Sequence, residues 1–266
     1  MYVFKFHKPS SVEDAAKAFA GADDARYLSG GHTLLPSMKL RLAGPSDLVD
    51  LSAIDSLKGI KVDADKVVIG AGTRHNDVAL SAEVRAAIPA LADLAGGIGD
   101  FQVRNRGTIG GSIANADPSA DYPAAVVGLG ATVHTNKRTI AGDDFFTGMF
   151  GTALDDGEIV TAVSFQRPKR AAYMKFPNPA SRYAVVGVMV AETASGMRVA
   201  VTGAAASVFR VPEMEKALAA SFSPDAIAGV AIPADNLNSD IHAAADYRAH
   251  LVGVMAKRAV AKAAGL

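Results

Sequence analysis

The chain has 266 residues, of which 50% are hydrophobic and 20% are charged, and its 27 basic and 27 acidic residues give a formal net charge of +0. This is the composition of an ordinary globular protein, and it lacks the basic excess typical of proteins that bind nucleic acid or an anionic membrane. The absence of cysteine excludes disulfides, thiolate zinc sites, a catalytic thiol and iron–sulfur ligation by this chain alone.

No leader or membrane anchor is expected from the sequence. The N-terminal stretch MYVFKFHKPSS lacks the apolar core of a signal peptide. The longest apolar run, from Tyr183 to Ala191, is much shorter than a membrane-spanning helix. We therefore expect a cytoplasmic protein without a membrane span.

Residues 1–57 are expected to alternate strands with helices. The segment FKFHKPSSVEDAAKAFAG predicts a strand, a turn and a helix that Ser10 caps, with Glu13 reaching back and Gly21 ending the helix. RYLSGG predicts a short strand that enters a glycine pair. TLLPSMKLR predicts a short helix with Pro36 in its opening turn, and DLVDLS predicts another strand.

Residues 58–167 continue with a predicted hairpin, GIKVDADKVVIGAG, which turns at Asp63–Asp65. Residues 75–97 are predicted to be mostly helical. A glycine-rich loop follows, then a helix from about Asp121 to Leu129 and a strand. EIVTAVSFQRP predicts the closing strand of this part.

The composition changes after Pro168. Two long apolar strands, RYAVVGVMVAET and GMRVAVTGAAASVF, precede a helical tail. In that tail Tyr247, Leu251, Val254, Arg258 and Ala259 recur near the 3.6-residue period of a helix. The pattern predicts an α+β chain with a domain over residues 1–167, made of subdomains at about 1–57 and 58–167. A smaller domain of antiparallel sheet and helices covers residues 168–266.

Several nucleotide-binding motifs can be weighed and set aside. No Gly-Lys pair occurs, so there is no P-loop. Gly70 and Gly72 follow a strand, but the third position of the dinucleotide motif is His75, and the alternation of a parallel sheet does not follow. A strand ending in a tight turn is favoured there. No HExxH or GxSxG pattern occurs, so zinc peptidase and serine hydrolase signatures are absent.

Two segments pair adjacent glycines with hydroxyl side chains. The first glycine segment is Ser29–Thr33 and the second glycine segment is Thr108–Ser112. Without a Cβ the backbone can approach an anion closely, and exposed N–H groups can point at it. Two such segments could hold one pyrophosphate without a lysine. On the residues alone, each pair could equally be a simple turn.

At these segments the sequence becomes recognisable. SGGHTLLPSMKLRLAGPSDLVDLS, followed by RNRGTIGGSIANADPSADYPAAVVGLGATV, resembles the FAD-binding medium subunit of molybdenum hydroxylases. The branch it resembles is the aerobic carbon monoxide dehydrogenase type, related to the flavin domain of xanthine dehydrogenase. The resemblance covers nearly the whole chain. It implies the two-subdomain FAD-binding fold of the PCMH and vanillyl-alcohol-oxidase type, followed by the small C-terminal domain.

The resemblance implies that both glycine segments embrace the FAD pyrophosphate and the ribityl chain. The residues carried over from the family are Ser29, Gly30, Gly31, His32, Thr33, Leu34, Thr108, Ile109, Gly110, Gly111 and Ser112. Asn115 and Asp117 are expected to shape the loop without touching the ligand.

Five further residues match flavin-contacting positions of the family, and each has an alternative interpretation. Asp121 lies where the family has a carboxylate near the polar chain of the flavin, or it caps the next helix. Tyr183 would stack on the isoalloxazine, or it is a core tyrosine on a buried strand. Lys175 would lie near the flavin, or it is a solvated surface lysine. Ile159 and Val160 would contact the flavin, or they pack in the core. The two prolines in KFPNPASRY depart from the relatives, so the flavin-facing turn is expected to differ.

The implied function is that of an electron-transfer subunit with non-covalent FAD and no catalytic residue or metal site of its own. A large partner with molybdenum–pterin would oxidise substrate, a small partner with [2Fe–2S] clusters would pass on electrons, and two such three-subunit units would form a dimer. His32 leaves a second possibility, because some stand-alone flavin oxidases attach FAD to a histidine in a similar context. A non-redox nucleotide-binding module is the third. Carbon monoxide, an aldehyde or an N-heterocycle all remain possible substrates, and the final acceptor is open.

Overall fold

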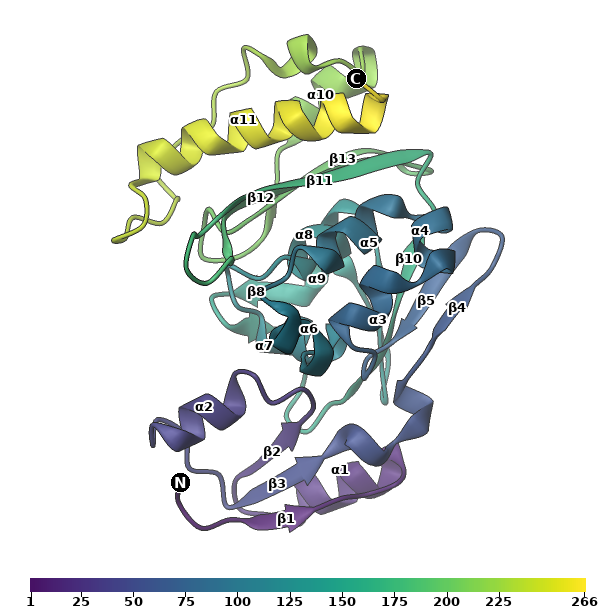
Figure 1. Ribbon diagram of the computed structural model, residues 1–266, viewed down its shortest axis with the longest axis vertical. Coiled ribbons are helices and arrows are strands. Elements are labelled where there is room, and N and C mark those ends of the chain that lie inside the picture. Colours follow the sequence, from purple (N-terminus) through teal and green to yellow (C-terminus); the bar gives the residue numbers. More distant parts are fainter.

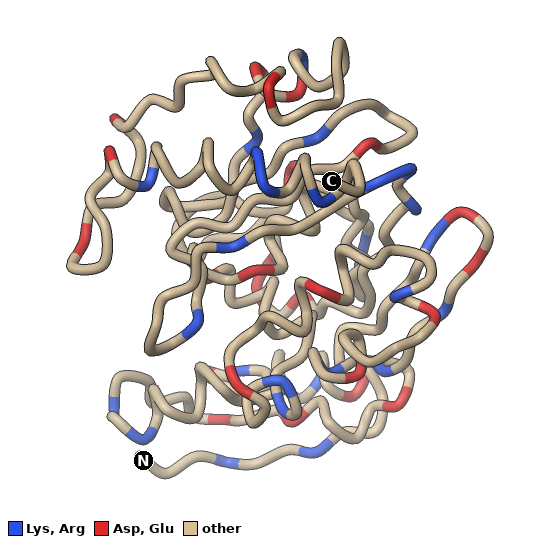
Figure 2. The backbone as a smooth tube through the Cα atoms, turned by 45° about the horizontal axis from the view of Figure 1, so that its top comes forward, with Lys and Arg blue, Asp and Glu red and all other residues tan.

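The computed structural model describes residues 1–266 as an α+β fold with three main sheets, each made from a continuous part of the chain (Figure 1). Lys and Arg are interspersed with Asp and Glu along the whole trace (Figure 2). No helix is both long enough and apolar enough to cross a membrane.

The N-terminal sheet is parallel, in the order β1-β3-β2, with strands Lys5–His7, Asp47–Asp50 and Ala25–Leu28. Helix α1 (Val12–Ala20) packs on β3, and helix α2 (Leu34–Lys39) follows β2. The cap of α1 is Ser11, not Ser10, because the Ser11 hydroxyl accepts from the Asp14 N–H. Gly21 ends the helix as predicted. Two 3₁₀ turns, η1 (Leu51–Ala53) and η2 (Asp55–Leu57), lead into the next part.

The middle sheet is antiparallel throughout, in the order β4-β5-β10-β6-β7. Its strands are Ile60–Val62, Lys66–Gly70, Val160–Gln166, Thr132–Thr135 and Thr139–Ala141. The hairpin at Asp63–Asp65 and the closing strand are therefore confirmed. Since no strand pair here is parallel, the turn at Gly70 and Gly72 is not a dinucleotide motif.

Six short helices pack between the middle sheet and the C-terminal sheet or at the cavity described below. They are α3 (His75–Leu80), α4 (Ala82–Ala87), α5 (Pro89–Gly96), α6 (Phe101–Arg106), α7 (Ile109–Asn115) and α8 (Tyr122–Gly128). A further turn of helix, α9 (Gly142–Phe145), leads to a small hairpin of β8 (Phe146–Gly148) and β9 (Gly151–Thr152). The helices at 75–97 and 121–129 are confirmed, whereas α6 and α7 replace the expected loop.

The C-terminal sheet has the antiparallel order β11-β12-β13-β14, with strands Arg170–Pro177, Ala184–Thr193, Gly196–Thr202 and Phe209–Arg210. The two long strands predicted after Pro168 are present, and β11 and β14 are additional. Helices α10 (Pro212–Ala220) and α11 (Ala245–Ala264) and the turn η3 (Pro224–Ile227) complete this part.

Strand β12 contains most of the longest apolar run of the sequence, and both of its faces are buried. Val188 and Val190 belong to the core under α11, while Met189 and Ala191 belong to the core of the middle part. A strand buried on both faces reads as a continuous apolar run instead of an alternating one.

Helix α11 turns a different face to the sheet than the sequence suggested. Leu251 and Ala259 are buried as predicted, but Tyr247 and Arg258 are exposed. Arg248 takes the place of an apolar residue on the buried face. Arg248 was not among the residues that the prediction named.

We propose the same domain division as the sequence suggested, 1–167 with subdomains at about 1–57 and 58–167, and 168–266. The division is supported by the sheets, because no strand of one range pairs with a strand of another.

Candidate functional site

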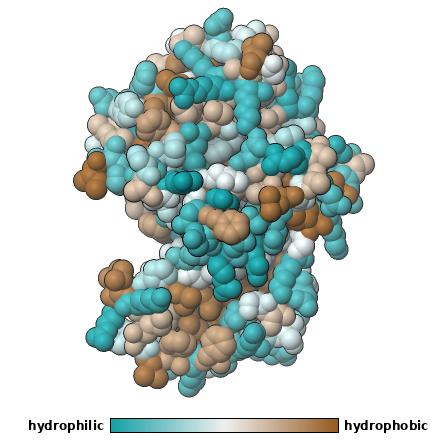
Figure 3. All heavy atoms as spheres, viewed as in Figure 1, coloured by the Kyte–Doolittle hydropathy of each residue, from teal (hydrophilic) through white to brown (hydrophobic).

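A cavity of about 1070 Å³ lies where the three parts of the chain meet, and Figure 3 shows the surface hollowed between the N-terminal sheet region and the rest. It exceeds the roughly 300–1,000 Å³ of common small-molecule pockets. Its wall is formed by the end of β2, the start of α2, the start of α7, the approach to β10 and the turn before β12. A long ligand would therefore contact all three parts of the chain.

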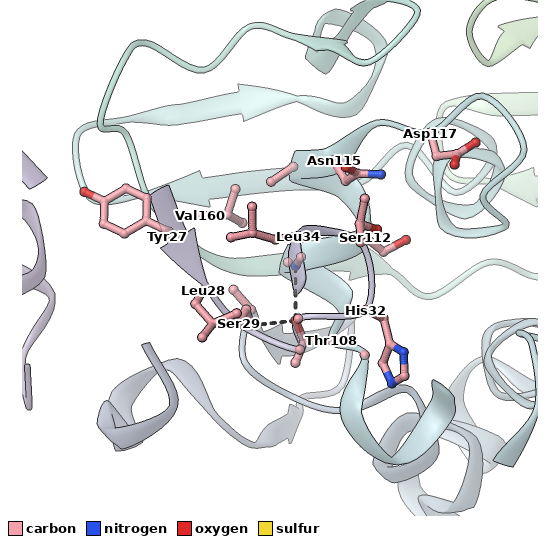
Figure 4. Close-up of a pocket in the computed structure, with 18 of the residues that line it drawn as sticks. Tyr27, Leu28, Ser29, His32, Leu34, Thr108, Ser112, Asn115, Asp117 and Val160 are labelled. Atoms are coloured by element: carbon pink, nitrogen blue, oxygen red, sulfur yellow. Dashed lines mark hydrogen bonds between the residues drawn. The ribbon is translucent and has the colours of Figure 1, made fainter. Parts of the chain in front are cut away.

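The first glycine segment lines this cavity and connects β2 to α2 (Figure 4). Gly31 has φ of +75°, a left-handed conformation that glycine adopts without the cost of a Cβ. None of the five backbone N–H groups from Gly30 to Leu34 donates a hydrogen bond within the protein. Consecutive unpaired amides of this kind form an anion-binding concavity.

The second glycine segment is not a loop but the first turn of helix α7. Thr108 caps the helix, since its hydroxyl accepts from the Gly111 N–H at 3.1 Å. The N–H groups of Ile109 and Gly110 donate to the carbonyls of Thr73 and Ala71, which close the turn after β5. The Ser112 N–H donates to the Thr108 carbonyl. The expectation that these amides are free for an anion is therefore wrong.

The glycines of this second segment allow close packing. A Cβ on Gly110 would lie 2.5 Å from the Ala71 Cβ, and one on Gly111 would lie 2.9 Å from the Thr108 hydroxyl. Ile109 is fully buried in the core of the middle part and does not line the cavity. Gly110, Gly111 and Ser112 do line it.

The two glycine segments contact each other directly. The hydroxyls of Ser29 and Thr108 hydrogen bond at 2.8 Å, drawn as a dashed line in Figure 4. A Cβ on Gly30 would lie 2.5 Å from the Arg106 carbonyl oxygen and 2.7 Å from the Gly107 Cα. Gly30 is therefore needed for the first segment to pack against the residues just before α7.

The approach to β10 supplies an apolar wall. Ile159 and Val160 are almost fully buried, and both line the cavity. Ile159 also belongs to the core of the N-terminal part and Val160 to that of the middle part. Both residues therefore pack in the core as well as facing the cavity, and their contact with flavin stays a prediction. Leu34 lines the cavity from α2. The Tyr27 hydroxyl donates to the Gly157 carbonyl at 3.0 Å, which joins β2 to the segment before β10.

Asp121 lies at the cavity as a buried carboxylate. It makes no side-chain hydrogen bond to the N-terminus of α8, so the capping interpretation is wrong. Instead it accepts from the Tyr173 hydroxyl at 2.5 Å and from Lys175 Nζ at 2.9 Å. Burial raises the pKa of Asp121, and the opposing effects of Lys175 and Tyr173 do not fully offset it.

Lys175 lies behind this carboxylate and does not line the cavity. Its side chain is only 10% exposed, which excludes the solvated-surface interpretation. Its ammonium donates to the carbonyls of Gly97 at 2.8 Å and Arg182 at 2.9 Å as well as to Asp121. Since an ammonium has three donors, its capacity is used within the protein.

Tyr183 precedes β12 and lies in the turn between β11 and β12. It is 46% exposed and lines the cavity, so the core-tyrosine interpretation is wrong. Burial of part of its ring raises the pKa of its phenol, and the carboxylates of Asp117 and Asp121 raise it further.

Several lining residues were missed by sequence reasoning. Asn115 and Asp117 line the cavity although they were expected only to shape the loop. Phe150 reaches it from the β8–β9 hairpin, whose pairing has no strong sequence signal. His75 is buried in the wall with Nδ1 unpartnered, and burial lowers its pKa to about 4, with His32 and Arg104 adding to the effect. No sequence signal pointed to His75 beyond its occupying the third position of the dinucleotide motif.

The arrangement suits a long anionic ligand more than hydrolytic chemistry. The structure contains no cluster of three His, Asp or Glu side chains that could hold a metal ion. The cavity instead combines unpaired amides, an apolar wall, a buried carboxylate and a half-exposed tyrosine.

Known proteins match this chain over almost its full length. The family described as "FAD binding domain in molybdopterin dehydrogenase" matches residues 2–168. The carbon monoxide dehydrogenase medium chain of Hydrogenophaga pseudoflava is 37% identical, over 97% of this chain and 96% of that protein. The nicotine 6-hydroxylase medium subunit of Paenarthrobacter nicotinovorans is 34% identical, over 97% and 96%.

The three-dimensional match is equally extensive. A chain of reconstituted CO dehydrogenase from Oligotropha carboxidovorans superimposes with a TM-score of 0.89 at 34% identity, covering 98% of this chain and 97% of that chain. The resemblance inferred from the sequence and its α+β FAD-binding fold are thus confirmed. This chain belongs to the FAD-binding medium subunits of the molybdenum hydroxylases, and it is an oxidoreductase subunit of that family.

Proposed function

We propose that this chain carries electrons through FAD from the [2Fe–2S] clusters of a small partner subunit to an external acceptor. A large partner with molybdenum–pterin would oxidise the substrate, and two three-subunit units would form a dimer in the cytoplasm. Support comes from the family and from relatives named as medium chains and medium subunits. The chain has no cysteine, so the thiolate ligands of the clusters must belong to another chain.

The observation that carries the proposal is the row of five unpaired amides at Gly30–Leu34 in the wall of a cavity shared by all three parts. FAD has two negative phosphates in the middle of a long molecule, and these residues fit it. Charge-assisted hydrogen bonds contribute about 1.5–3 kcal/mol each. Several of them would anchor the diphosphate without a lysine.

The two glycine segments have different roles in this proposal. The first would bind the diphosphate with its backbone, and His32 and Thr33 would flank it. The second would shape the site, because the amides of Ile109–Ser112 are already bonded. Its contribution to the ligand would come from the Ser112 hydroxyl, which lines the cavity.

The cavity lining differs in chemistry from place to place. Tyr27 packs against the core that contains Ile159, whereas Tyr183 lies near enough to Asp117 and Asp121 for their carboxylates to raise the pKa of its phenol. Tyr27 and Asp117 lie on opposite sides of the view in Figure 4. We assign the isoalloxazine to the part lined by Tyr183, because an aromatic ring offers a stacking surface. Asp121 would orient it, with Lys175 holding Asp121 in place. When bound, FAD supplies the exchange of one or two electrons, and the chain supplies orientation and shielding from water.

The attachment of FAD is proposed to be non-covalent. His32 lies at the cavity and is the one candidate for attachment in the first glycine segment, while a cysteine attachment is excluded. Stand-alone oxidases that attach FAD in this way carry a much larger substrate domain than the residues after Pro168 provide.

The substrate is proposed to be determined in the large partner. Relatives named for carbon monoxide and for nicotine both match this chain end to end. Neither name transfers to this chain, because the residues that would contact substrate lie elsewhere. A carbon monoxide, aldehyde or N-heterocycle hydroxylase would each fit, and so would more than one final acceptor.

Anaerobic spectroscopy of the isolated chain tests the proposal. We expect the chain to bind one FAD, seen as visible flavin bands, and dithionite to bleach them. Carbon monoxide, aldehydes and purines should leave the isolated chain oxidised, and addition of the two partner subunits should make bleaching depend on substrate. Bleaching of the isolated chain by an organic substrate would instead establish a stand-alone oxidase. Absence of flavin uptake would favour a non-redox nucleotide-binding module.

A further inference from the structure

Tyr183 is presented to the cavity by a turn that is closed on itself. The Asn178 N–H donates to the Tyr183 carbonyl at 2.8 Å, and the Arg182 N–H donates to the Asn178 carbonyl at 2.9 Å. The side-chain oxygen of Asn178 accepts from the N–H groups of Ala180 at 2.9 Å and Ser181 at 3.1 Å. Arg182 has φ of +61°, which is uncommon for a residue with a Cβ. The turn therefore depends on the bonds that Asn178 makes.

The orientation of the Asn178 amide follows from those bonds. Its oxygen must face the two backbone donors, so its nitrogen faces the other way. There Nδ2 donates to His242 Nδ1 at 3.2 Å. Asn178 is almost fully buried, whereas His242 is exposed. The turn is thus joined to a loop that lies 64 positions further along the chain.

The loop that carries His242 is itself fixed from helix α11. Asp240 Oδ1 accepts from the N–H groups of His242 at 2.9 Å and Ala243 at 3.1 Å. Asp240 Oδ2 accepts from Arg248 Nη2 at 2.7 Å. The other end of the same guanidinium donates to the carbonyls of Val185 at 2.6 Å and Gly203 at 2.9 Å. Arg248 therefore fixes the position of the His242 loop relative to the start of β12.

We propose that Asn178 and His242 are positioning residues for Tyr183, and this proposal rests on the function proposed above. Four residues form the series Arg248–Asp240–His242–Asn178, which runs from helix α11 to the turn, and its Asp240–His242 link is made through the backbone N–H of His242. The Tyr183 ring has no hydrogen bond of its own to a protein group. Its position is set by the backbone of the turn, which this series holds on one side while Lys175 holds the Arg182 carbonyl on the other.

Helix α11 thus takes part in the proposed flavin site from outside the cavity. None of Asn178, Asp240, His242 or Arg248 lines the cavity. Loosening the series should let the tyrosine leave the isoalloxazine without removing any group that contacts FAD. The diphosphate anchor at Gly30–Leu34 should be unaffected.

His242→Ala in the FAD-loaded chain tests the proposal. Because His242 is exposed, the substitution should not threaten folding. Loss of one hydrogen bond should raise amide hydrogen exchange at Ala180–Arg182 by about fivefold, and flavin fluorescence should rise as Tyr183 moves off the ring. FAD occupancy should stay complete. His250→Ala, at an exposed histidine of α11 with no hydrogen bond to the turn, is the matched control and should change neither signal.

His242→Asn is the conservative rescue, because its side-chain oxygen takes the place of Nδ1. It should return both signals toward those of the unmodified chain. Asn178→Ala removes all three side-chain bonds and should loosen the turn more than His242→Ala. The double variant should then match Asn178→Ala alone. Additive effects in the double variant, or unchanged exchange in His242→Ala, would overturn the proposal.

Amide hydrogen exchange reports on the turn, whereas flavin fluorescence reports on the contact between Tyr183 and FAD, so failure of one proposal can be told from failure of the other. Faster exchange with unchanged fluorescence would overturn the stacking of Tyr183 on flavin while leaving the hydrogen-bonded turn intact. Exchange measured without FAD should show the same difference between His242→Ala and His250→Ala, and its absence would overturn the positioning series itself.

Discussion

Ser29 and Thr108 lie 79 positions apart in the chain, and their hydroxyl oxygens are 2.8 Å apart at the wall of the cavity. Thr108 also caps helix α7 by accepting from the Gly111 N–H. One hydroxyl therefore caps the start of helix α7 and joins it to the first glycine segment, which contains the unpaired amides.

Thr108→Val should remove both bonds and keep a similar volume. Loss of a helix cap costs about 0.5–2 kcal/mol, so we expect the free energy of unfolding to fall by that amount and FAD affinity to weaken. Thr108→Ser keeps the hydroxyl and should behave almost like the unmodified chain. Chemical denaturation and flavin titration measure the two effects, and equal affinity in the Val and Ser variants would show that the contact does not shape the site.

Gly30→Ala should lower FAD occupancy strongly, although the substitution adds only one methyl group. The added Cβ would lie 2.5 Å from the Arg106 carbonyl oxygen, so the first glycine segment must move away from α7. The flavin-to-protein ratio after purification is the measurement. Gly253→Ala is the control, because a Cβ there meets nothing within 4 Å and should stabilise helix α11 by up to about 1 kcal/mol. Full occupancy in Gly30→Ala would mean that the close contact is not required.

Acid precipitation should release all the flavin into the supernatant. We expect this because no cysteine is available and His32 is assigned only a non-covalent role beside the diphosphate. Mass spectrometry of the pellet checks the result. Flavin mass on a peptide that contains His32 would contradict the non-covalent proposal.

Tyr183→Ala should alter the flavin spectrum and slow electron delivery in the assembled enzyme. Substrate oxidation measured with an artificial acceptor that bypasses FAD should stay unchanged, because the residue lies in this chain and not at the molybdenum site. Tyr183→Phe keeps the ring and should restore delivery. Anaerobic stopped-flow at the flavin band measures the rate, and normal reduction in the Ala variant would remove Tyr183 from the site.

Stability should fall at low pH as Glu158 gains a proton. Burial raises the pKa of this carboxyl, but hydrogen bonds from Arg138, Thr135 and the Asp155 N–H outweigh burial and hold it at about 2. The ordinary value is 4.5. A lowered pKa in the folded state stabilises the fold above the ordinary value, and that stabilisation is lost as pH falls from 4.5 to about 2.

Denaturation midpoints across this pH range check the expectation. Glu158→Gln should be less stable at neutral pH, and its stability should depend less on pH between these limits. Glu213→Gln, at an exposed position of α10, is the control and should follow the unmodified chain. An unchanged pH profile in Glu158→Gln would contradict the assignment.

Local features of the fold were predictable where the signal is short in range. The hairpin at Asp63–Asp65, the end of α1 at Gly21 and strand β12 follow from turn residues, a glycine cap and an apolar run. The cap at Ser11 was missed by one residue because Ser10 and Ser11 carry the same side chain. Helix α7 was missed because glycine is a poor helix former, and there its packing against Ala71 decides the structure.

The amino-acid sequence by itself determined the family, the α+β class and the absence of cysteine ligands, because motifs and composition are properties of the chain alone. Only the tertiary structure decided which glycine segment has backbone amides without a partner in the protein. Both segments look alike in sequence, but the amides of Ile109 and Gly110 are taken by carbonyls of Thr73 and Ala71, far away in the chain, while those of Gly30–Leu34 are not. The same holds for Lys175 and Asp121, whose burial and pairing arise where three parts of the chain meet. Hydrogen-bond capacity is local, but whether it is already used depends on neighbours that folding brings together.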